Sequence, residues 1–272
     1  MTVVGVVGTG NMGAALVRGW LRSSPVEPTF VVWDKAEAAA RRLVVEDRVR
    51  MASSLADLAS SSELILVVVK PKDAPELLET MRPLLTEAHT VVSSMAGVTL
   101  DSMRALVGPG PTLFRIMPNL GVELNVGVVA AAAETGADQT AITSILELLA
   151  PLGLADLLPE DLIDVATAVG GSGPGFLALA IEALEDGAVA AGITRPQARS
   201  LVRQAANEAA AGLREHSDSA AALQRHLAAT GQLFPPGIGT LEQHGTRSAF
   251  QQAVSAAIEK SRRSGGSHVS PR

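Results

Sequence analysis

The residues best suited to chemistry stand near the start of the chain, where three glycines follow the apolar run Val3–Val7. The spacing Gly8-x-Gly10-x-x-Gly13 fits a strand-to-helix turn that binds a dinucleotide. Gly8 permits the tight turn, Gly10 lets the backbone approach a pyrophosphate, and Gly13 allows close helix–strand contact. An ordinary strand–helix turn is the alternative, but free N–H groups at a helix N-terminus suit an anion. We therefore predict a cofactor site formed by Gly8, Thr9, Gly10, Asn11 and Met12.

A second cofactor position is predicted at Asp34, which follows the apolar run Phe30–Trp33. An acidic residue here can bind the ribose hydroxyls of NADH and repels the 2′-phosphate of NADPH. The neighbouring Lys35, with Arg41 and Arg42, favours the phosphate instead. A solvated start to the next helix would explain the same charges. We expect Asp34 and Lys35 to bind the cofactor, with NADH slightly favoured and NADPH left open.

The composition excludes several other kinds of site. The 272 residues carry a net charge of −6 and only 3% aromatics, which disfavours a nucleic-acid binder with a basic face and stacking rings. There is no cysteine, so disulfides, thiolate nucleophiles and cysteine-ligated metals are ruled out. The five histidines are scattered, at positions 89, 216, 226, 244 and 268, and no metal site is predicted.

The chain is expected to be soluble and cytoplasmic. Met1-Thr2-Val3-Val4 leads directly into a strand pattern, with no basic segment or cleavage site of a secretory signal. The absence of cysteine suits a reducing compartment. No uninterrupted apolar stretch approaches the ~20 residues of a membrane span, so no membrane association is expected.

The first half of the chain must position these residues, and it alternates apolar β-branched runs with helical stretches. That alternation is typical of a parallel sheet covered by helices. The expected strands are Val3–Val7, Phe30–Trp33, Leu64–Val69, Thr90–Ser94, Leu113–Met117 and Val126–Ala131. The expected helices are Met12–Leu21, Lys35–Val44, Leu55–Ser60, Ala74–Leu85, Leu100–Val107 and Gln139–Leu149.

After Pro159 the composition shifts to Ala, Leu, Gln and Glu with apolar residues at helical spacing. The expected helices are Gly175–Ala191, Arg195–Glu215, Ser219–Ala229 and Thr246–Arg262. The fold class is therefore α/β: a doubly wound, mostly parallel Rossmann domain over residues 1–160, then an all-helical domain over 161–263. Residues 264–272 are rich in Gly, Ser and Pro and are expected to be a disordered tail.

Several further motifs occur in a fixed order along the chain. They are Val69-Lys70-Pro71, Val91-Val92-Ser93-Ser94-Met95-Ala96-Gly97-Val98-Thr99-Leu100, Arg115-Ile116-Met117-Pro118-Asn119, Gly171-Ser172-Gly173-Pro174 and Leu241-Glu242-Gln243-His244-Gly245. Together with the glycine loop they resemble the pyrroline-5-carboxylate reductase family over nearly the whole chain, to about Arg262. The β-hydroxyacid dehydrogenases share the opening motif, but they carry a lysine one turn into a later helix. The stretch Pro174–Ile181 contains none.

This resemblance implies an NADPH- or NADH-dependent reduction of the cyclic imine 1-pyrroline-5-carboxylate to proline. It places Val69, Lys70, Pro71, Ala96 and Asn119 at the cofactor, and Gly171, Ser172, Gly173 and Pro174 in a loop at the substrate. It also implies a homodimer or higher homo-oligomer, joined through the helical domain, with a small imine as substrate. A cyclic imine is readily protonated, so placement of the two reactants is the main task, and no His/Asp/Glu constellation is required.

The sequence departs from the family at the loop of the form S-P-G-G-T-T, which is thought to hold the substrate carboxylate and supply a hydroxyl near the imine nitrogen. Without gaps, Ala229-Thr230-Gly231-Gln232-Leu233-Phe234 occupies this position. With a gap, Pro235-Pro236-Gly237-Ile238-Gly239-Thr240 does so instead. The ungapped version is preferred slightly. Either Thr230 or Thr240 is then the hydroxyl donor, and Gly231 and Phe234 are expected at the substrate.

A further departure follows the Met-Pro-Asn motif, where Leu120-Gly121 replaces the family's Thr-Pro. Three interpretations stay open. The chain is a pyrroline-5-carboxylate reductase with unusual loops, or a family member that reduces another imine or a carbonyl, or a non-catalytic regulatory protein that binds NAD(P).

Overall fold

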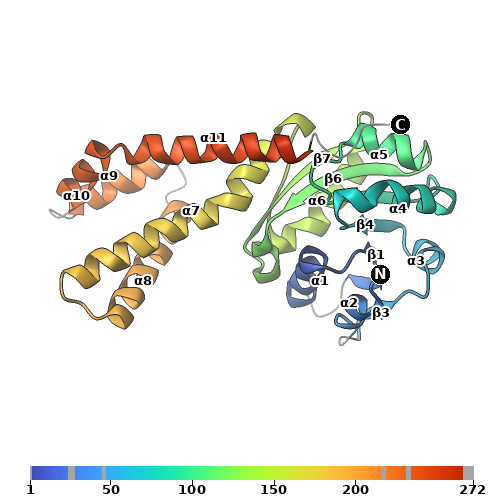
Figure 1. Ribbon diagram of the computed structural model, residues 1–272, viewed down its shortest axis with the longest axis horizontal. Helices are drawn as coiled ribbons and strands as arrows, with labels where there is room; N and C mark the ends of the chain where they lie inside the picture. Colours follow the sequence, from blue (N-terminus) through green and yellow to red (C-terminus); the bar gives the residue numbers. More distant parts are fainter. Residues whose placement is uncertain (1, 24–27, 45–46, 216–218, 231–233, 266–272) are drawn as a thin grey trace. The chain divides into compact units, whose positions relative to one another are not determined.

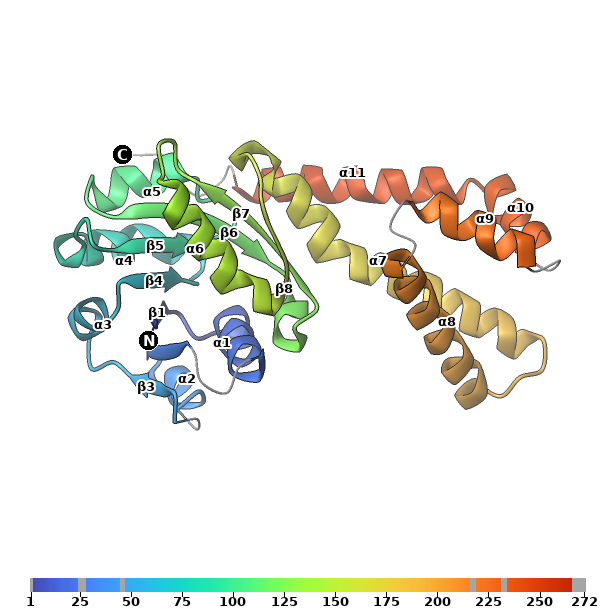
Figure 2. The ribbon, with the colours of Figure 1, turned by 180° about the vertical axis from the view of Figure 1, so that it is seen from behind.

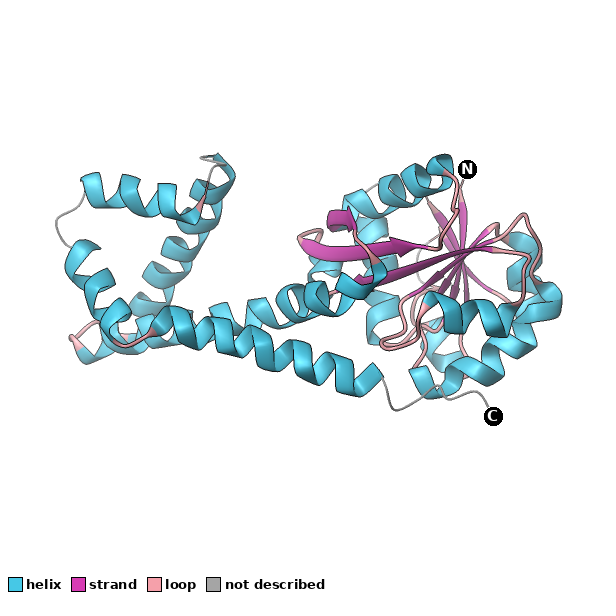
Figure 3. Ribbon diagram, turned by 90° about the horizontal axis from the view of Figure 1, so that it is seen from above, coloured by secondary structure: helices cyan, strands magenta, loops and turns pink. Residues whose placement is uncertain are grey.

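The structure is a computed structural model that describes residues 2–23, 28–44, 47–215, 219–230 and 234–265. All described strands belong to one eight-stranded sheet in the N-terminal part (Figure 1, Figure 3). The strands are β1 (Val3–Val7), β2 (Thr29–Trp33), β3 (Val49–Met51), β4 (Leu64–Val67), β5 (Thr90–Ser93), β6 (Thr112–Pro118), β7 (Gly127–Ala133) and β8 (Gly153–Leu157).

The sheet order is β3-β2-β1-β4-β5-β6-β7-β8, and β1 to β6 are parallel. β7 runs antiparallel to β6, and β8 is parallel to β7. The chain steps from β1 to β2 and β3 on one side, then crosses to β4 on the other. This reversal makes the carboxyl ends of β1 and β4 the topological switch point, where such sheets bind ligands. The predicted doubly wound, mostly parallel fold is confirmed.

Two hydrophobic layers cover the faces of the sheet (Figure 1, Figure 2). One contains side chains of α1 (Asn11–Ser23) and α6 (Gln139–Leu149), and its largest side chain, that of Trp20, is 1% exposed. The other contains side chains of α3 (Leu55–Ser61), α4 (Ala74–Met81) and α5 (Leu100–Val107). Because both faces are buried, the parallel strands are continuous apolar runs rather than alternating ones, which is why most were predictable.

The remaining helices follow the sheet. Short elements near it are α2 (Glu37–Arg41) and the 3₁₀ turns η1 (Pro71–Asp73), η2 (Arg82–Leu84), η3 (Leu120–Leu124), η4 (Ala150–Leu152) and η5 (Glu160–Leu162). The C-terminal helices are α7 (Ile163–Ala190), α8 (Arg195–Glu215), α9 (Ala220–Thr230), α10 (Phe234–Gln243) and α11 (Thr246–Gly265).

The described residues form two compact units. One comprises the residues up to Gly171 together with those from Ala257 onward, and the other is Ser172–Ala256. The second unit has few buried side chains, and many of its large apolar residues are exposed. The expected disordered tail falls mainly on residues 266–272, which lie outside the described residues, whereas residues 264 and 265 belong to α11.

The largest correction concerns Gly171, Ser172, Gly173 and Pro174, which were expected in a loop but lie inside α7. A proline in a helix removes the hydrogen bond to the carbonyl four residues earlier, which here is that of Gly170. The Asn119 side-chain amide donates to this carbonyl at 2.7 Å. The helix therefore continues through Pro174 and begins at Ile163, rather than at Gly175 as predicted.

A second correction concerns Pro235–Thr240, which the gapped alignment treats as a loop but which lies in α10. Proline is compatible with a first helical turn because its missing N–H would have no intrahelical partner there. The strands β3 and β8 were missed. β3 has only three residues with Arg50 in the middle, and β8 is an edge strand whose side chains are mostly not buried.

Candidate active site

The register of the sheet brings three loops to one edge. Val7 of β1 pairs with Trp33 of β2 on one side and with Val67 of β4 on the other. The segments that leave these strands therefore start at the same level, at the carboxyl ends of parallel strands. They are the glycine loop, the Asp34–Lys35 segment and the stretch from Val68 to Asp73.

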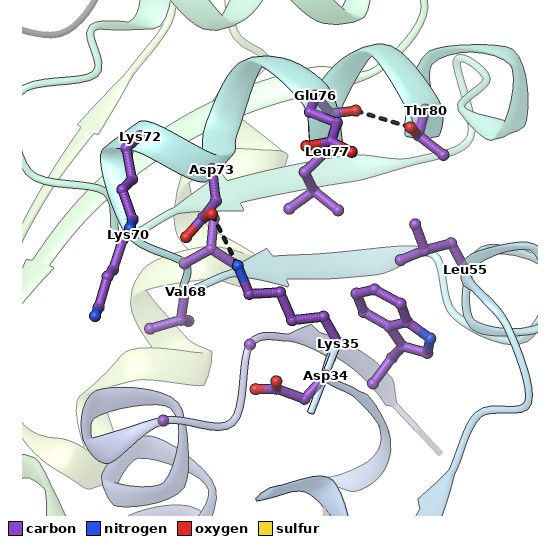
Figure 4. Close-up of a pocket in the computed structure, with 14 residues that line it drawn as sticks. Asp34, Lys35, Leu55, Val68, Lys70, Lys72, Asp73, Glu76, Leu77 and Thr80 are labelled. Carbon is purple, nitrogen blue, oxygen red and sulfur yellow. Dashed lines mark hydrogen bonds and ion pairs between the residues drawn. The ribbon is translucent and has the colours of Figure 1, made fainter. Parts of the chain in front are cut away.

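A pocket of about 530 Å³ lies between these three segments (Figure 4). Six predicted cofactor residues line it: Gly8, Gly10, Asp34, Lys35, Val69 and Lys70. The sequence did not predict the rest of its wall, which is Trp33, Leu55, Val68, Lys72, Asp73, Glu76, Leu77 and Thr80. Leu55 and Leu77 lie on one side of the pocket (Figure 4), and Trp33 also lines it, so the wall includes apolar and aromatic surface that can hold an adenine ring.

The three glycines of the loop differ in why a side chain would not fit: two are enclosed by the protein's own backbone, and the third faces the pocket. A Cβ on Gly8, whose φ is +96°, would lie 2.3 Å from the Val68 carbonyl oxygen. A Cβ on Gly13 would overlap the Gly8 carbonyl oxygen. A Cβ on Gly10 would meet nothing within 4 Å, yet Gly10 lines the pocket. The protein's own packing does not require glycine there, whereas a pyrophosphate close to the backbone would.

Asp34 is fixed at the edge of this pocket by backbone donors. Thr9 donates its N–H to Asp34 Oδ2 at 2.7 Å and its hydroxyl to the same oxygen at 3.1 Å. The backbone N–H of Ala36 donates to Asp34 Oδ1 at 2.9 Å. The predicted residue Thr9 is buried and does not line the pocket, so its contribution is to hold the carboxylate beside the glycine loop.

The helix that follows the glycine loop presents its N-terminus here. α1 begins at Asn11, and the first N–H to bond back into the turn is that of Ala14, which donates to the Gly10 carbonyl. The N–H groups of Asn11, Met12 and Gly13 precede it and have no acceptor within the helix. Asn11 and Met12 therefore offer backbone donors for an anion, as predicted for a dinucleotide pyrophosphate.

Lys35 and Asp73 form an ion pair across the pocket, from the end of β2 to η1 (Figure 4). Lys35 Nζ donates to Asp73 Oδ1 at 2.8 Å. The hydrogen bond to Asp73 raises the pKa of Lys35, and the same bond lowers the pKa of Asp73. Both groups are therefore charged at neutral pH. Asp73 was not predicted, although its position two residues after Pro71 could have indicated it.

The other predicted residues lie outside the wall of this pocket. Pro71 begins η1, and Ala96 is exposed after β5. Asn119 uses both ends of its amide internally: its Oδ1 accepts from Gly121 and Val128, and its Nδ2 donates to Gly170. A cofactor contact by these three residues stays a prediction.

The predicted substrate residues fall in the helical part. Gly171 and Gly173 lie in α7, and a Cβ added at either position would meet nothing within 4 Å, so internal packing does not require them to be glycine. Thr240 lies inside α10, where its hydroxyl donates to the Pro236 carbonyl at 3.2 Å. Thr230 ends α9 and Phe234 begins α10, while Gly231 lies outside the described residues. Within the described residues, no three His, Asp or Glu side chains converge to hold a metal.

The N-terminal half has the fold and pocket of a dinucleotide-binding enzyme, and residues 3–97 match the family described as "NADP oxidoreductase coenzyme F420-dependent". Fold and site thus define the class: a Rossmann-type NAD(P)H-dependent oxidoreductase. Residues 160–264 match the family "Pyrroline-5-carboxylate reductase dimerisation".

Comparison with individual proteins narrows the class. The chain is 32% identical to pyrroline-5-carboxylate reductase 3 of Danio rerio, over 96% of this chain and 91% of that protein. It is 30% identical to pyrroline-5-carboxylate reductase of Methanosarcina acetivorans, over 96% and 97%. The chain belongs to the pyrroline-5-carboxylate reductase family. A solved pyrroline-5-carboxylate reductase from Coxiella burnetii shares its fold, with a TM-score of 0.88 at 24% identity, over 96% of this chain and 97% of that one.

Proposed function

We propose that this protein reduces the C=N bond of 1-pyrroline-5-carboxylate to give proline, with NADH or NADPH as the hydride donor. The observation that carries the proposal is the pocket at the switch point, where glycine at position 10 leaves room for a ligand to approach the backbone. Membership of the family over nearly the whole chain names the substrate. A hydride adds to the imine carbon, and a proton ends on the nitrogen.

The bound nicotinamide supplies the hydride, and the protein supplies placement. The backbone at Gly10 and the N-terminus of α1 hold the pyrophosphate. Asp34 accepts hydrogen bonds from the adenosine ribose hydroxyls. Because a cyclic imine is readily protonated in solution, no side chain has to act as a strong acid. This accounts for a site built from glycines, backbone donors and apolar walls.

The substrate end belongs to the helical part. Glycine in a helix interior costs about 1 kcal/mol relative to alanine, and α7 carries Gly171 and Gly173 where no described neighbour requires them. We assign these glycines, with Ser172 and Pro174, to the substrate site, where the missing side chains leave room for another molecule. Thr230 and Thr240 stay as alternative predictions for the hydroxyl near the imine nitrogen, with Gly231 and Phe234 at the substrate.

The helical part also joins two copies of the chain. Leu177, Leu179 and Leu184 of α7 are 62%, 67% and 60% exposed, which is unusual for leucines so close together. Among the described residues, the helix Glu160–Ala190 is the one long and apolar enough to cross a membrane by length and composition. A partner subunit accounts for this surface better, because the dimerisation family covers it.

We therefore assign residues 1–160 to coenzyme binding and 161–263 to the substrate and to dimer formation. The protein works in the cytoplasm as a homodimer or a higher homo-oligomer, without nucleic acid or membrane. Light scattering at micromolar concentration tests the assembly. A monomer would contradict it, and so would a detergent requirement for solubility.

A second candidate function follows from the altered substrate stretch. Leu233 and Phe234 stand where the family carries threonines in the ungapped alignment, and Leu120-Gly121 replaces Thr-Pro. Such apolar replacements would favour an imine or carbonyl substrate without the carboxylate. A panel of cyclic imines that lack a carboxylate separates the two candidates, because the first requires preference for pyrroline-5-carboxylate.

The test of the main proposal is oxidation of NADH and NADPH in the presence of DL-pyrroline-5-carboxylate at neutral pH. The matched variant is Gly10→Ala, which should keep the melting temperature and lose coenzyme binding and turnover, because its Cβ projects only into the pocket. Turnover that stays at the blank rate with every imine, while both coenzymes bind, would instead indicate a non-catalytic NAD(P)-binding protein.

A further inference from the structure

The end of the pocket that receives the adenosine ribose is acidic on both walls. Asp34 lies at the end of β2, where its carboxylate is held by the N–H groups of Thr9 and Ala36. Asp73 lies opposite, in η1, and lines the same pocket. In a Rossmann site the residue at the end of the second strand meets the ribose 2′ position. A 2′-phosphate would therefore approach Asp34 directly.

The cation best placed to receive that phosphate is already engaged. Lys35 is next to Asp34 in the chain, and its Nζ donates to Asp73 Oδ1 at 2.8 Å. Figure 4 shows its side chain extending from the end of β2 to η1. To bind a 2′-phosphate, Lys35 would have to leave Asp73 and would leave that carboxylate without its partner. A 2′-hydroxyl makes no such demand.

Other cations in this part of the protein do not replace Lys35. Arg41 donates to Glu37 within α2, through Nε at 3.0 Å and Nη2 at 2.5 Å, and Arg41 and Arg42 do not line the pocket. Lys70 and Lys72 line it at the end away from Leu55 and Leu77 (Figure 4). They are thus on the side of the pyrophosphate rather than the adenine.

We propose that the protein selects NADH over NADPH, and that Asp73 is a second determinant of this selection because it holds Lys35 away from the 2′ position. Asp34 repels the phosphate, and Asp73 withdraws the charge that would compensate for it. This inference rests on the proposed function only in that a nicotinamide dinucleotide occupies this pocket. It adds a residue from η1 to the β2 residue that usually decides coenzyme choice.

The test measures binding without turnover. NADH and NADPH are titrated by calorimetry and by quenching of tryptophan fluorescence, and 2′,5′-ADP is compared with 5′-ADP as a competitor. The wild-type protein should bind NADH at least about tenfold more tightly, since like-charge contacts are costly at an interface. Asp34→Asn should reduce this preference most, because it removes the facing charge and keeps the acceptor oxygen.

The decisive variant is Asp73→Asn. It should improve NADPH binding about threefold, in keeping with the small worth of an exposed ion pair, and change NADH binding by a smaller factor. In a Lys35→Ala background the same substitution should have no effect, because there is no lysine to release. Glu79→Gln is the matched control: it removes a charge from an exposed position on the same side of the sheet, in α4, outside the pocket wall.

Several results would overturn the proposal. One is wild-type protein that binds NADPH as tightly as NADH. Another is an Asp73→Asn effect that is equal for both coenzymes, persists without Lys35, or is reproduced by Glu79→Gln. Melting temperatures establish that each variant is folded. If the wild-type protein binds neither coenzyme, the proposed function is wrong as well. If it binds NADH selectively but reduces no imine, only the proposed function is wrong.

Discussion

The two halves of this chain differ in how much of their apolar surface is buried within a single subunit. In the Rossmann half, helices of the same chain cover both faces of the sheet, and all residues that line the pocket proposed for the coenzyme lie in one unit. In the helical half, Ala198, Val202 and Glu185 are among the few buried residues, while leucines along α7 are more than half exposed. The Rossmann half is self-sufficient in the sense that it buries its own apolar surface. The helical half leaves apolar side chains exposed, as one side of a protein–protein interface does in a single subunit.

This difference explains why the coenzyme end of the site is easier to assign than the substrate end. Three segments of the pocket proposed for the coenzyme follow the carboxyl ends of β1, β2 and β4, so their position is set by the sheet register. Gly171 and Gly173 of α7 instead have no described neighbour within 4 Å of an added Cβ. If a second copy of the chain fills the space next to them, the substrate site forms only on assembly.

The largest expected effect is a loss of free energy of unfolding, and its dependence on protein concentration should differ between substitutions in the two halves. Trp20 is 1% exposed, and its Nε1 donates to the Leu148 carbonyl at 2.6 Å. Trp20→Ala should lower the free energy of unfolding by about 3–5 kcal/mol at every protein concentration. Leu179→Ala should do so only where the dimer forms, since mass action links assembly to stability.

Urea denaturation over a hundredfold range of protein concentration measures both variants. If Leu179→Ala costs the same at the lowest and highest concentrations, the exposed face of α7 is not an interface between copies.

A smaller effect is expected where the sheet meets the start of the helical half. Arg115 is 4% exposed in β6, and its Nη1 donates to Glu160 Oε1 at 3.3 Å. The same oxygen accepts from the Leu100 N–H at 2.8 Å. Glu160→Gln should cost about 2 kcal/mol, below the range for a fully buried pair, because Glu160 is partly exposed.

The matched control is Glu123→Gln, which removes an exposed partner of Arg18 and should cost about 0–1 kcal/mol. Equal losses in the two variants, by chemical denaturation, would show that burial of Arg115 does not increase the cost of removing its partner.

The sequence predicted most strands of the self-sufficient half, and it predicted α8, α9 and α11 of the other half at or near their observed bounds. It did not predict where α7 begins, and it did not predict α10. Strand β1 was predicted at its observed bounds because a doubly buried strand is a continuous apolar run. The glycine loop was readable because Gly8 and Gly13 are demanded by close backbone contacts. Asp73 was not predicted, because its role depends on a contact with Lys35 from another loop. The sheet register brings these two loops together, and the local sequence around Asp73 does not show it.

In the helical half, local signals were ambiguous. Pro174 suggested the start of a helix, but Asn119 satisfies the carbonyl that this proline leaves without a donor, so the helix continues. The gapped alignment with the family's loop treated Pro235–Thr240 as a loop, but this stretch lies in α10, with Pro235 and Pro236 in its first turn. Interactions that decide such cases lie far away in the sequence, or in a second copy of the chain.

A third prediction tests that long-range contact. Asn119→Ala removes the donor to the Gly170 carbonyl and also the acceptor of the Gly121 and Val128 N–H groups. The bond to Gly170 should account for about 1 kcal/mol of the loss, the usual net value of a hydrogen bond. In a Pro174→Ala background the cost should be smaller, since the new backbone N–H at position 174 can donate to the same carbonyl. A double-mutant cycle by urea denaturation gives the coupling between the two positions. Additive losses would mean that the amide does not compensate for the proline.

The smallest expected effect is a pH dependence confined to the Rossmann half. Asp57 in α3 accepts from Arg50 Nη2 at 3.0 Å and from the Ser53 N–H at 2.8 Å. The hydrogen bond from Arg50, followed by that from the Ser53 backbone, holds the pKa of Asp57 well below its usual range. The folded protein therefore binds this proton less readily than the unfolded chain, so the ionised carboxylate stabilises the fold above the unfolded pKa of about 4.

That contribution should disappear as the pH falls from about 4 towards the folded pKa. Wild-type protein should then be more stable than Asp57→Asn at pH 7, and the difference should shrink on acidification. Urea midpoints measured from pH 7 to pH 3 provide the comparison, with Arg50→Ala as the variant that removes the main cause of the shift. Because Asp57 and Arg50 lie on the exposed side of α3 and β3, the stabilisation is modest. A difference that stays constant over this range would show that the asparagine acts through shape or capping, and that the charge of Asp57 adds nothing to the self-sufficient half.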